Sequence, residues 1–285
     1  MSSSGSSRLS GPNSPRGEAL PRVLAYHKVT AFELGGTWLS APRFIRQIDA
    51  VLESGRRFID EDAFLAALDG ARPCAASEVL LTFDDGYREL LDRAVPALES
   101  RGVRALIFLP SAYVGRENSW ELALPGRRFE HLGWDEARDL VRRGFSFGSH
   151  GRTHRDLTRL GAAALREELA GSREEIEGRL GAPVRSLSYP FGRLNAGVRS
   201  EAERAGYRAA FSLYPPRGSA PGDRFALRRE GVYVIDTAAS VKAKLGRGVP
   251  FLVEDIVGRS INGCAVLTPL LKDAAARVRR TLRRR

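Results

Sequence analysis

Short apolar runs alternate with amphipathic helical segments along most of this chain, and this alternation restricts the fold more than any other feature. Apolar runs that indicate strands cover residues 22–26, 79–83, 104–110, 145–148, 185–190, 208–213 and 232–235. Helical patterns cover residues 41–55, 62–70, 88–100, 134–144, 161–180, 195–206 and 237–245. Strands that are connected through helices pair in parallel. The pattern therefore predicts an α/β fold with a mainly parallel sheet, closed or partly closed into a barrel.

The two ends of the chain differ from its middle in composition. Residues 1–20 are rich in Ser, Gly and Pro and lack the apolar segment of a secretory signal, so we expect a disordered leader. The alternating pattern predicts a main domain over 21–245, followed by a C-terminal extension over 246–285 with a basic helical tail. No run approaches the roughly 18 apolar residues that span a membrane. These features predict a cytoplasmic protein, with the membrane surface as an open alternative.

Arginine dominates the charge of this chain, which has a formal net charge of +11. The arginines are spread along the sequence except at the end, where ARVRRTLRRR (276–285) concentrates them. A basic helix there is suited to peripheral contact with an anionic membrane, and a solvated tail is the alternative. The sequence has no nucleic-acid motif and no aromatic interleaving of the kind that single-strand binders use. We therefore expect no nucleic-acid partner.

Two adjacent carboxylates follow the apolar run at 79–83. Asp84 and Asp85 come directly after it and precede Gly86. An Asp-Gly turn would explain this stretch without any function. In a barrel of β/α units, however, catalytic residues gather at the carboxyl ends of the strands. The pair therefore indicates a catalytic site, provided that other reactive side chains reach the same end.

Three of the four histidines lie beside predicted strand ends. His27 follows the first strand, His150 comes two residues after the strand at 145–148, and His154 is four residues further on. This spacing predicts that His150 and His154 project from one side of a helical turn, as in many metal sites, with surface histidines as the alternative. Two histidines and one carboxylate leave metal coordination positions open for water and substrate. One aspartate would then bind the metal and the other would act as a base.

The segments TFDDGY, SHGRTHRDL and SYPFGRLN, in this order and spacing, resemble the polysaccharide deacetylase family. These are the NodB-homology domains, similar to carbohydrate esterase family 4, and the similarity runs from about residue 22 to about residue 235. The resemblance implies a distorted (β/α)7 barrel. It also implies a metal-dependent hydrolase that removes N-acetyl groups from an N-acetylated glycan, which could be a polysaccharide, an oligosaccharide or a lipid-linked sugar.

The resemblance assigns roles to four residues of these segments. It implies that Asp84 is the general base, and that Asp85, His150 and His154 hold one divalent metal ion, Zn or alternatively Co, Ni or Mn. Water activated by the metal would attack the acetamide carbonyl. The remaining histidine, His131, is expected to have a structural role or to lie at the rim of the barrel.

Two departures from the family pattern concern catalysis. Many members orient the base with an arginine at the position of Ser188, and we consider Arg185 and Arg193 as substitutes. The family usually places its general-acid histidine in a late Leu-x-His motif, but no histidine follows His154. One branch, which resembles the poly-N-acetylglucosamine deacetylases, carries this histidine in an N-terminal Y-H-x-V motif. The segment AYHKV matches that arrangement and predicts His27 as the general acid.

The resemblance also suggests groups that bind the substrate. The main-chain N–H of Phe191 would stabilise the oxyanion, beside Tyr189, and Arg228 and Arg229 would line the substrate groove. Two other functions would use the same residues. One is an amidase that acts on a non-sugar, non-peptide C–N bond. The other is a glycan-binding protein without activity, which the two departures from the family pattern would favour.

Overall fold

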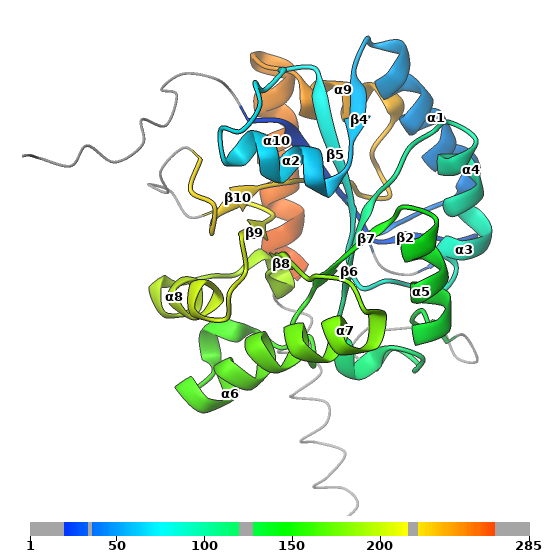
Figure 1. The fold of residues 1–285 in the computed structure, drawn as a ribbon. Coiled ribbons are helices and arrows are strands. Elements are labelled where there is room, and N and C mark those ends of the chain that lie inside the picture. The colour runs from blue at the N-terminus through cyan, green and yellow to red at the C-terminus, as the bar shows by residue number, and fades with distance from the viewer. Residues whose placement is uncertain (1–19, 34–35, 120–127, 216–221, 266–285) are drawn as a thin grey trace, which may run out of the picture.

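The computed structural model describes residues 20–33, 36–119, 128–215 and 222–265 of the chain. Within these ranges, helices surround a curved sheet of parallel strands (Figure 1). The expectations for residues 1–19 of the leader and for the basic tail lie outside the described residues.

The main sheet contains nine strands in the order β10-β9-β8-β7-β6-β5-β1-β11, with β4 beside β5. Its strands are β1 (Arg22–Tyr26), β4 (Arg57–Ile59), β5 (Glu78–Phe83), β6 (Leu106–Leu109), β7 (Ser146–Ser149), β8 (Ser186–Ser188), β9 (Ala209–Ser212), β10 (Leu227–Arg228) and β11 (Glu230–Gly231). A separate small sheet consists of β2 (Lys28–Val29) and β3 (Trp38–Leu39). All pairs of named strands in the described residues are parallel, which confirms the predicted sheet type.

The sheet closes through one short segment, residues 227–231. In this segment β10 pairs with β9, whereas β11 pairs with β1. Arg229 lies between the two strands, and its main-chain N–H donates to the carbonyl oxygen of Ser212 in β9 at 2.9 Å. The wall of the described barrel therefore consists of seven strand positions, namely β1, β5, β6, β7, β8, β9 and the closing segment. This arrangement confirms the distorted (β/α)7 barrel.

The strand predicted at 232–235 is wrong, because β11 ends before it. The main-chain N–H of Tyr233 donates to the Asp236 carboxylate at 2.7 Å, and the N–H of Val234 donates to the carbonyl oxygen of Gly36 at 2.8 Å. These bonds fold the segment into a turn that leaves the sheet. Val232 and Tyr233 are buried as expected, but Ile235 is 57% exposed, and an apolar run alone does not distinguish a strand from a turn.

The helices up to residue 245 lie where the alternation predicts them, with two interruptions, and one further helix follows beyond the predicted ranges. The structure places α1 (Ala41–Glu53), α2 (Glu61–Leu68), α3 (Leu90–Arg93), α4 (Val95–Glu99), α5 (Trp134–Arg142), α6 (Ala162–Arg166), α7 (Ser172–Leu180), α8 (Ala196–Arg204), α9 (Ala238–Leu245) and α10 (Val249–Ala265). Short turns are η1 (Ser111–Tyr113), η2 (Leu157–Arg159), η3 (Glu167–Gly171) and η4 (Pro190–Gly192). Pro96 has no N–H to continue a preceding helix, and it accompanies the break between α3 and α4. A π-helical turn, η3, separates α6 from α7.

The barrel interior is apolar at one end and polar at the other. Leu80 of β5 belongs to a buried cluster with Phe108 and Phe211, which side chains of α2 complete. Successive residues of a strand point to opposite faces of the sheet, so Thr82 and then Asp84 follow Leu80 on the same side. The alternation along β5 thereby delivers Asp84 to the polar end, where the strands terminate.

The described part of the C-terminal extension packs against the barrel. Asp255 of α10 accepts a hydrogen bond of 2.6 Å from Arg228, and the Tyr233 hydroxyl donates to the carbonyl oxygen of Gly258 at 3.4 Å. α10 therefore runs along the segment that closes the sheet. Among the described helices, none combines the length and the apolar content that crossing a membrane requires.

Candidate active site

Three buried side chains from different parts of the chain form a candidate metal centre. Oδ1 of Asp85 lies 3.4 Å from Nε2 of His154 and 3.7 Å from Nε2 of His150, and the three donor atoms lie within 4.8 Å of one another. Donor atoms at ~2.1 Å from a tetrahedral metal ion are about 3.4 Å apart. One carboxylate and two imidazoles in this arrangement fit a divalent cation with open coordination positions.

The protonation state of the two histidines suits metal binding. His150 donates from Nδ1 to the carbonyl oxygen of Ser188 at 2.8 Å, which leaves the lone pair of Nε2 directed at Asp85. Burial lowers the pKa of His150 to about 4. Burial, and then the neighbouring His150, lowers the pKa of His154 well below its ordinary value. Both rings are therefore neutral at neutral pH, as metal ligands must be.

The backbone at two of the ligands adopts a conformation that is unusual for residues with side chains. Asp85 has a φ of 67° and His154 a φ of 53°, both in the left-handed region. His131 donates from Nδ1 to the main-chain oxygen of Asp85 at 2.7 Å, which holds the turn. Gly86 also has a positive φ, and a Cβ there would lie 2.3 Å from a methyl group of Leu109. The site therefore requires glycine directly after the ligand.

The two histidines do not lie on a helical turn, so that prediction is wrong. The chain between them is irregular, and the left-handed φ of His154 is incompatible with a right-handed helix. The main-chain N–H groups of Arg152 and Thr153 donate instead to Glu168, at 2.8 and 2.9 Å. This carboxylate takes the place of the helical acceptors. It turns the loop so that His154 still reaches the same point as His150.

The second carboxylate of the pair is held by a buried arginine. Asp84 is 2% exposed, and each of its two carboxylate oxygens accepts a hydrogen bond of 2.7 Å from Arg229. The guanidinium group also donates to the Ser188 hydroxyl at 2.7 Å. Burial by itself raises the pKa of Asp84, but the charge and hydrogen bonds of Arg229, together with the neighbouring histidines, outweigh burial and lower the pKa below its ordinary value of 3.8. Asp84 is therefore ionised and fixed in orientation.

Arg229 provides the arginine contact to Asp84 that this chain lacks at Ser188. Neither of the substitutes considered from the sequence reaches Asp84. Arg185 binds Glu61 at 2.8 Å, and Arg193 pairs with Asp156. The alternation of side chains along a strand could have identified Arg229. Arg228 points to the outer face of the sheet, so the next residue points inward.

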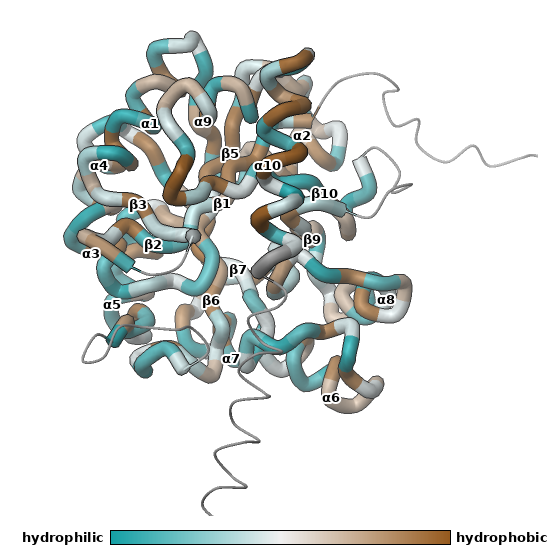
Figure 2. Tube along the Cα trace, turned by 180° about the vertical axis from the view of Figure 1, so that it is seen from behind, coloured by the Kyte–Doolittle hydropathy of each residue, from teal (hydrophilic) through white to brown (hydrophobic). Residues whose placement is uncertain are grey.

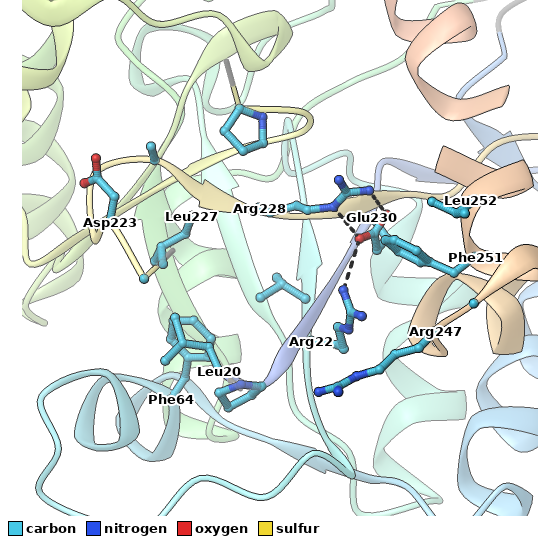
Figure 3. Close-up of a pocket in the computed structure, with 16 residues that line it drawn as sticks. Leu20, Arg22, Phe64, Asp223, Leu227, Arg228, Glu230, Arg247, Phe251 and Leu252 are labelled. Carbon is cyan, nitrogen blue, oxygen red and sulfur yellow. Dashed lines mark hydrogen bonds and ion pairs between the residues drawn. The ribbon is translucent and has the colours of Figure 1, made fainter. Parts of the chain in front are cut away.

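Arg228 is not brought to the site. It donates to Glu230 and to Asp255, each at 2.6 Å, and its guanidinium group lies between the rings of Tyr214 and Phe251. Figure 3 shows it on the wall of a cavity of about 590 Å³ beside α10, on the outer side of the closing segment. The prediction that Arg228 lines the substrate groove is therefore not supported, because the alternation of the strand directs it away from the interior.

His27 lies close to the base. It follows β1, and its Nε2 is 3.8 Å from Oδ2 of Asp84. Its side chain is 13% exposed, so the ring is largely enclosed but reaches the surface of the site. Parallel pairing of β1 with β5 causes this proximity, since Tyr26 is in register with Phe83.

The two remaining predicted residues have different positions. Phe191 has a φ of 60°, and its ring meets that of His154 edge-on with the ring centres 4.8 Å apart, so it borders the metal centre. Tyr189 is fully buried, and its hydroxyl donates to the carbonyl oxygen of Phe225 at 3.0 Å. Its main-chain N–H donates to Phe211. The structure therefore places Tyr189 in the core and does not bring it to the site.

The sequence matches a known family and a protein that belongs to it by name. Residues 72–210 match the family described as "Polysaccharide deacetylase". The chain is also 26% identical over 210 residues to the Bacillus subtilis (strain 168) protein YxkH, whose name assigns it provisionally to the polysaccharide deacetylases. That alignment covers 73% of this chain and 69% of YxkH.

Solved structures share the barrel at low sequence identity. The deacetylase PplD of Streptococcus pyogenes, solved in complex with acetate, superposes with a TM-score of 0.70 at 19% identity, covering 81% of this chain and all of PplD (100%). IcaB of Ammonifex degensii gives 0.65 at 24% identity, with coverage of 79% and 95%. A polysaccharide deacetylase of Bacillus cereus gives 0.64 at 23% identity, with coverage of 79% and 68%. The sequence of residues 72–210 is therefore similar to the polysaccharide deacetylase family, and the solved structures show that this chain has the same barrel fold.

Proposed function

We propose that this protein is a metal-dependent hydrolase that removes N-acetyl groups from an N-acetylated sugar. The observation that carries the proposal is the convergence of three kinds of group at one end of the barrel. Asp85, His150 and His154 form a metal-binding set, Asp84 is an ionised carboxylate held by an arginine, and His27 lies beside it. A base, a metal centre and a proton donor are the groups that hydrolysis of an acetamide requires.

The side chains support a divalent cation held by Asp85, His150 and His154. Their donor atoms are buried and close enough to share one ion, and both imidazoles are neutral. Nitrogen and carboxylate ligands suit Zn, and Co, Ni or Mn would also accept them. A cation held there would supply Lewis acidity, which polarises a carbonyl oxygen and eases deprotonation of water.

Asp84 would act as the general base. Because Arg229 stabilises the carboxylate form, Asp84 is ready to accept a proton from the attacking water at neutral pH. The two parallel hydrogen bonds leave the carboxylate little rotational freedom. Asp84 therefore offers its remaining lone pairs in a fixed direction.

His27 would act as the general acid. An amine is a poor leaving group unless its nitrogen is protonated as the C–N bond breaks, so a donor must reach that nitrogen. Nε2 of His27 lies 3.8 Å from Asp84, on the side of the site formed by the end of β1. The main-chain N–H of Phe191, which borders His154, would donate to the developing oxyanion.

The placement of Arg229 and His27 favours catalysis over a binding protein without activity. The inactive alternative was suggested by the missing arginine at Ser188 and the missing late histidine. Arg229 donates both to the Ser188 hydroxyl and to Asp84, and His27 reaches the same carboxylate from β1. Both departures therefore have a compensating residue in this chain.

Release of acetate from N-acetylglucosamine oligomers tests the proposal. The purified protein, reconstituted with Zn or Co, should release acetate and produce free amino sugar, and Asp84→Asn should reduce this rate by about 10²-fold or more. Ammonia release from small linear and cyclic amides, measured in parallel, tests the amidase alternative. Equal rates for the parent protein and Asp84→Asn on every N-acetylated glycan would refute the proposal.

A further inference from the structure

The outer face of α10 is an exposed apolar stripe. Val249, Leu252, Val253 and Ile256 are 72%, 55%, 53% and 65% exposed. Their spacing of three, four and seven residues places them on one side of the helix over two turns. Much of α10 is brown in Figure 2, in keeping with its apolar composition. Isolated exposed apolar residues are ordinary, whereas four in one stripe form a continuous apolar surface of the kind that docking sites use.

The acidic residues of α10 are turned away from this stripe. Glu254 lies 3.8 Å from Lys244, and Asp255 accepts a hydrogen bond of 2.6 Å from Arg228, so both carboxylates face the barrel. Their side chains are only 17% and 18% exposed. The exposed charged residues at the edges of the stripe are Arg247, which also lines the cavity of Figure 3, and Arg259, which donates to Asp255 at 3.0 Å. The outer face of α10 is therefore apolar, with one arginine at each end of the stripe and the acidic side chains directed inward.

We infer that this face of α10 docks on an anionic lipid membrane. A helix with an apolar stripe and flanking arginines inserts its apolar side chains at the level of the acyl chains, while the arginines contact the headgroups. The sequence that follows α10 has the same sign of charge, because residues 266–285 contain six arginines and one lysine against one aspartate. This surface lies outside the proposed catalytic groups, so the inference goes beyond the proposed function.

Charge favours a lipid surface over a second copy of the chain. In a symmetric dimer, each copy would present Arg247 and Arg259 to the same face of its partner. The described acidic residues of α10 already have basic partners in their own chain and are largely covered. Arg259 shares Asp255 with Arg228, so such a dimer would add positive charge at this face without a further acidic group to pair it, whereas anionic headgroups would neutralise it.

Docking through α10 would bring one side of the barrel to the membrane. The hydroxyl of Tyr233, a residue just after β11, donates to the carbonyl oxygen of Gly258 late in α10. The later part of the helix therefore lies level with the ends of the strands, which also carry Asp84 and His27. The stripe begins at the opposite end, where the Phe251 ring lies 4.9 Å from the guanidinium group of Arg22 at the start of β1, so a docked molecule would lie with this side of the barrel along the headgroups.

Co-sedimentation of the full chain with vesicles tests the inference. We expect binding to vesicles of equimolar phosphatidylcholine and phosphatidylglycerol, and at least tenfold weaker binding to pure phosphatidylcholine. The double variant Leu252→Glu/Ile256→Glu should lose at least tenfold in affinity for the anionic vesicles. Ile235→Glu is the matched control, because Ile235 is equally exposed (57%) but lies off α10, and it should bind like the parent protein.

Two further measurements separate the alternatives. Arg283, Arg284 and Arg285 changed together to Gln should weaken vesicle binding while leaving the effect of Leu252→Glu/Ile256→Glu in place. If only the arginine changes weaken vesicle binding, the tail binds the vesicles without α10 and the inference is wrong. The inference would also be wrong if the parent protein does not bind vesicles and instead forms a concentration-dependent dimer in sedimentation velocity. In that case Ile256→Glu should convert the dimer to a monomer. Unchanged circular dichroism and melting temperature confirm that the variants are folded.

Discussion

The guanidinium group of Arg229 donates one hydrogen bond of 2.7 Å to each carboxylate oxygen of Asp84. Arg229 is the residue between β10 and β11, where the sheet passes from pairing with β9 to pairing with β1. Closure of the barrel and orientation of the base therefore depend on the same residue. A planar guanidinium fork matches a carboxylate in both distance and direction, which a lysine ammonium group cannot do.

Arg229→Lys should reduce acetate release by about 100-fold, because the base keeps a positive neighbour but loses its fixed orientation. The matched control is Arg228→Lys, one residue earlier, whose partners Glu230 and Asp255 lie outside the site. That variant should retain the activity of the parent protein. Steady-state kinetics on the same N-acetylated oligomer measure the loss of activity in each variant. Equal losses in the two would show a general effect of the segment on stability.

Removal of the metal should lower both activity and thermal stability. An ion present at 100 times its Kd stabilises the folded state by about 2.7 kcal/mol, so chelation should reduce the melting temperature and Zn or Co should restore it. Asp85→Asn should abolish the metal-dependent rise, because the carboxylate donor is lost. Asp139→Asn, which changes an exposed carboxylate on α5, should show the full rise. Metal content by mass spectrometry provides the second readout.

His27→Ala should lose amide hydrolysis selectively. Without a proton donor, release of an amine should slow by about 10²–10⁴-fold. Hydrolysis of an activated acetate ester should change far less, because a phenolate leaves without protonation. Metal affinity should remain that of the parent protein, since the metal-binding set does not include His27. Equal losses on the ester and the amide would assign His27 a role in positioning Asp84 and exclude it as the acid.

Gly86→Ala should destabilise the protein by about 3 kcal/mol, which combines left-handed strain with overpacking. The new Cβ would lie 2.3 Å from a methyl group of Leu109. Gly102→Ala is the control, because Gly102 also has a positive φ but a methyl group added there would have no atom of another residue within 4 Å. It should cost only about 1–2 kcal/mol for the backbone conformation. Denaturant unfolding of the two variants measures the difference.

Local sequence patterns predicted most of the secondary structure. The strand ending at Phe83, the helix predicted over 41–55 and observed over 41–53, and the parallel arrangement could all be predicted, because burial periodicity and glycine stops are encoded by neighbouring residues. β4 (Arg57–Ile59) was missed, since two of its three residues are not fully buried and its short run lacks the apolar signature. The strands at 227–231 were also missed, because polar residues interrupt them.

The sequence by itself determined which residues can perform the chemistry. The paired aspartates after an apolar strand, the two histidines four residues apart and the histidine after the first strand were all recognisable, because strand ends and motifs are local features. Only the tertiary structure decided how they are arranged. It selected Arg229 over Arg228 as the partner of Asp84, and it directed Tyr189 into the core. The physical reason is that the inward or outward direction of a side chain depends on strand register and barrel closure, which join residues far apart in the chain.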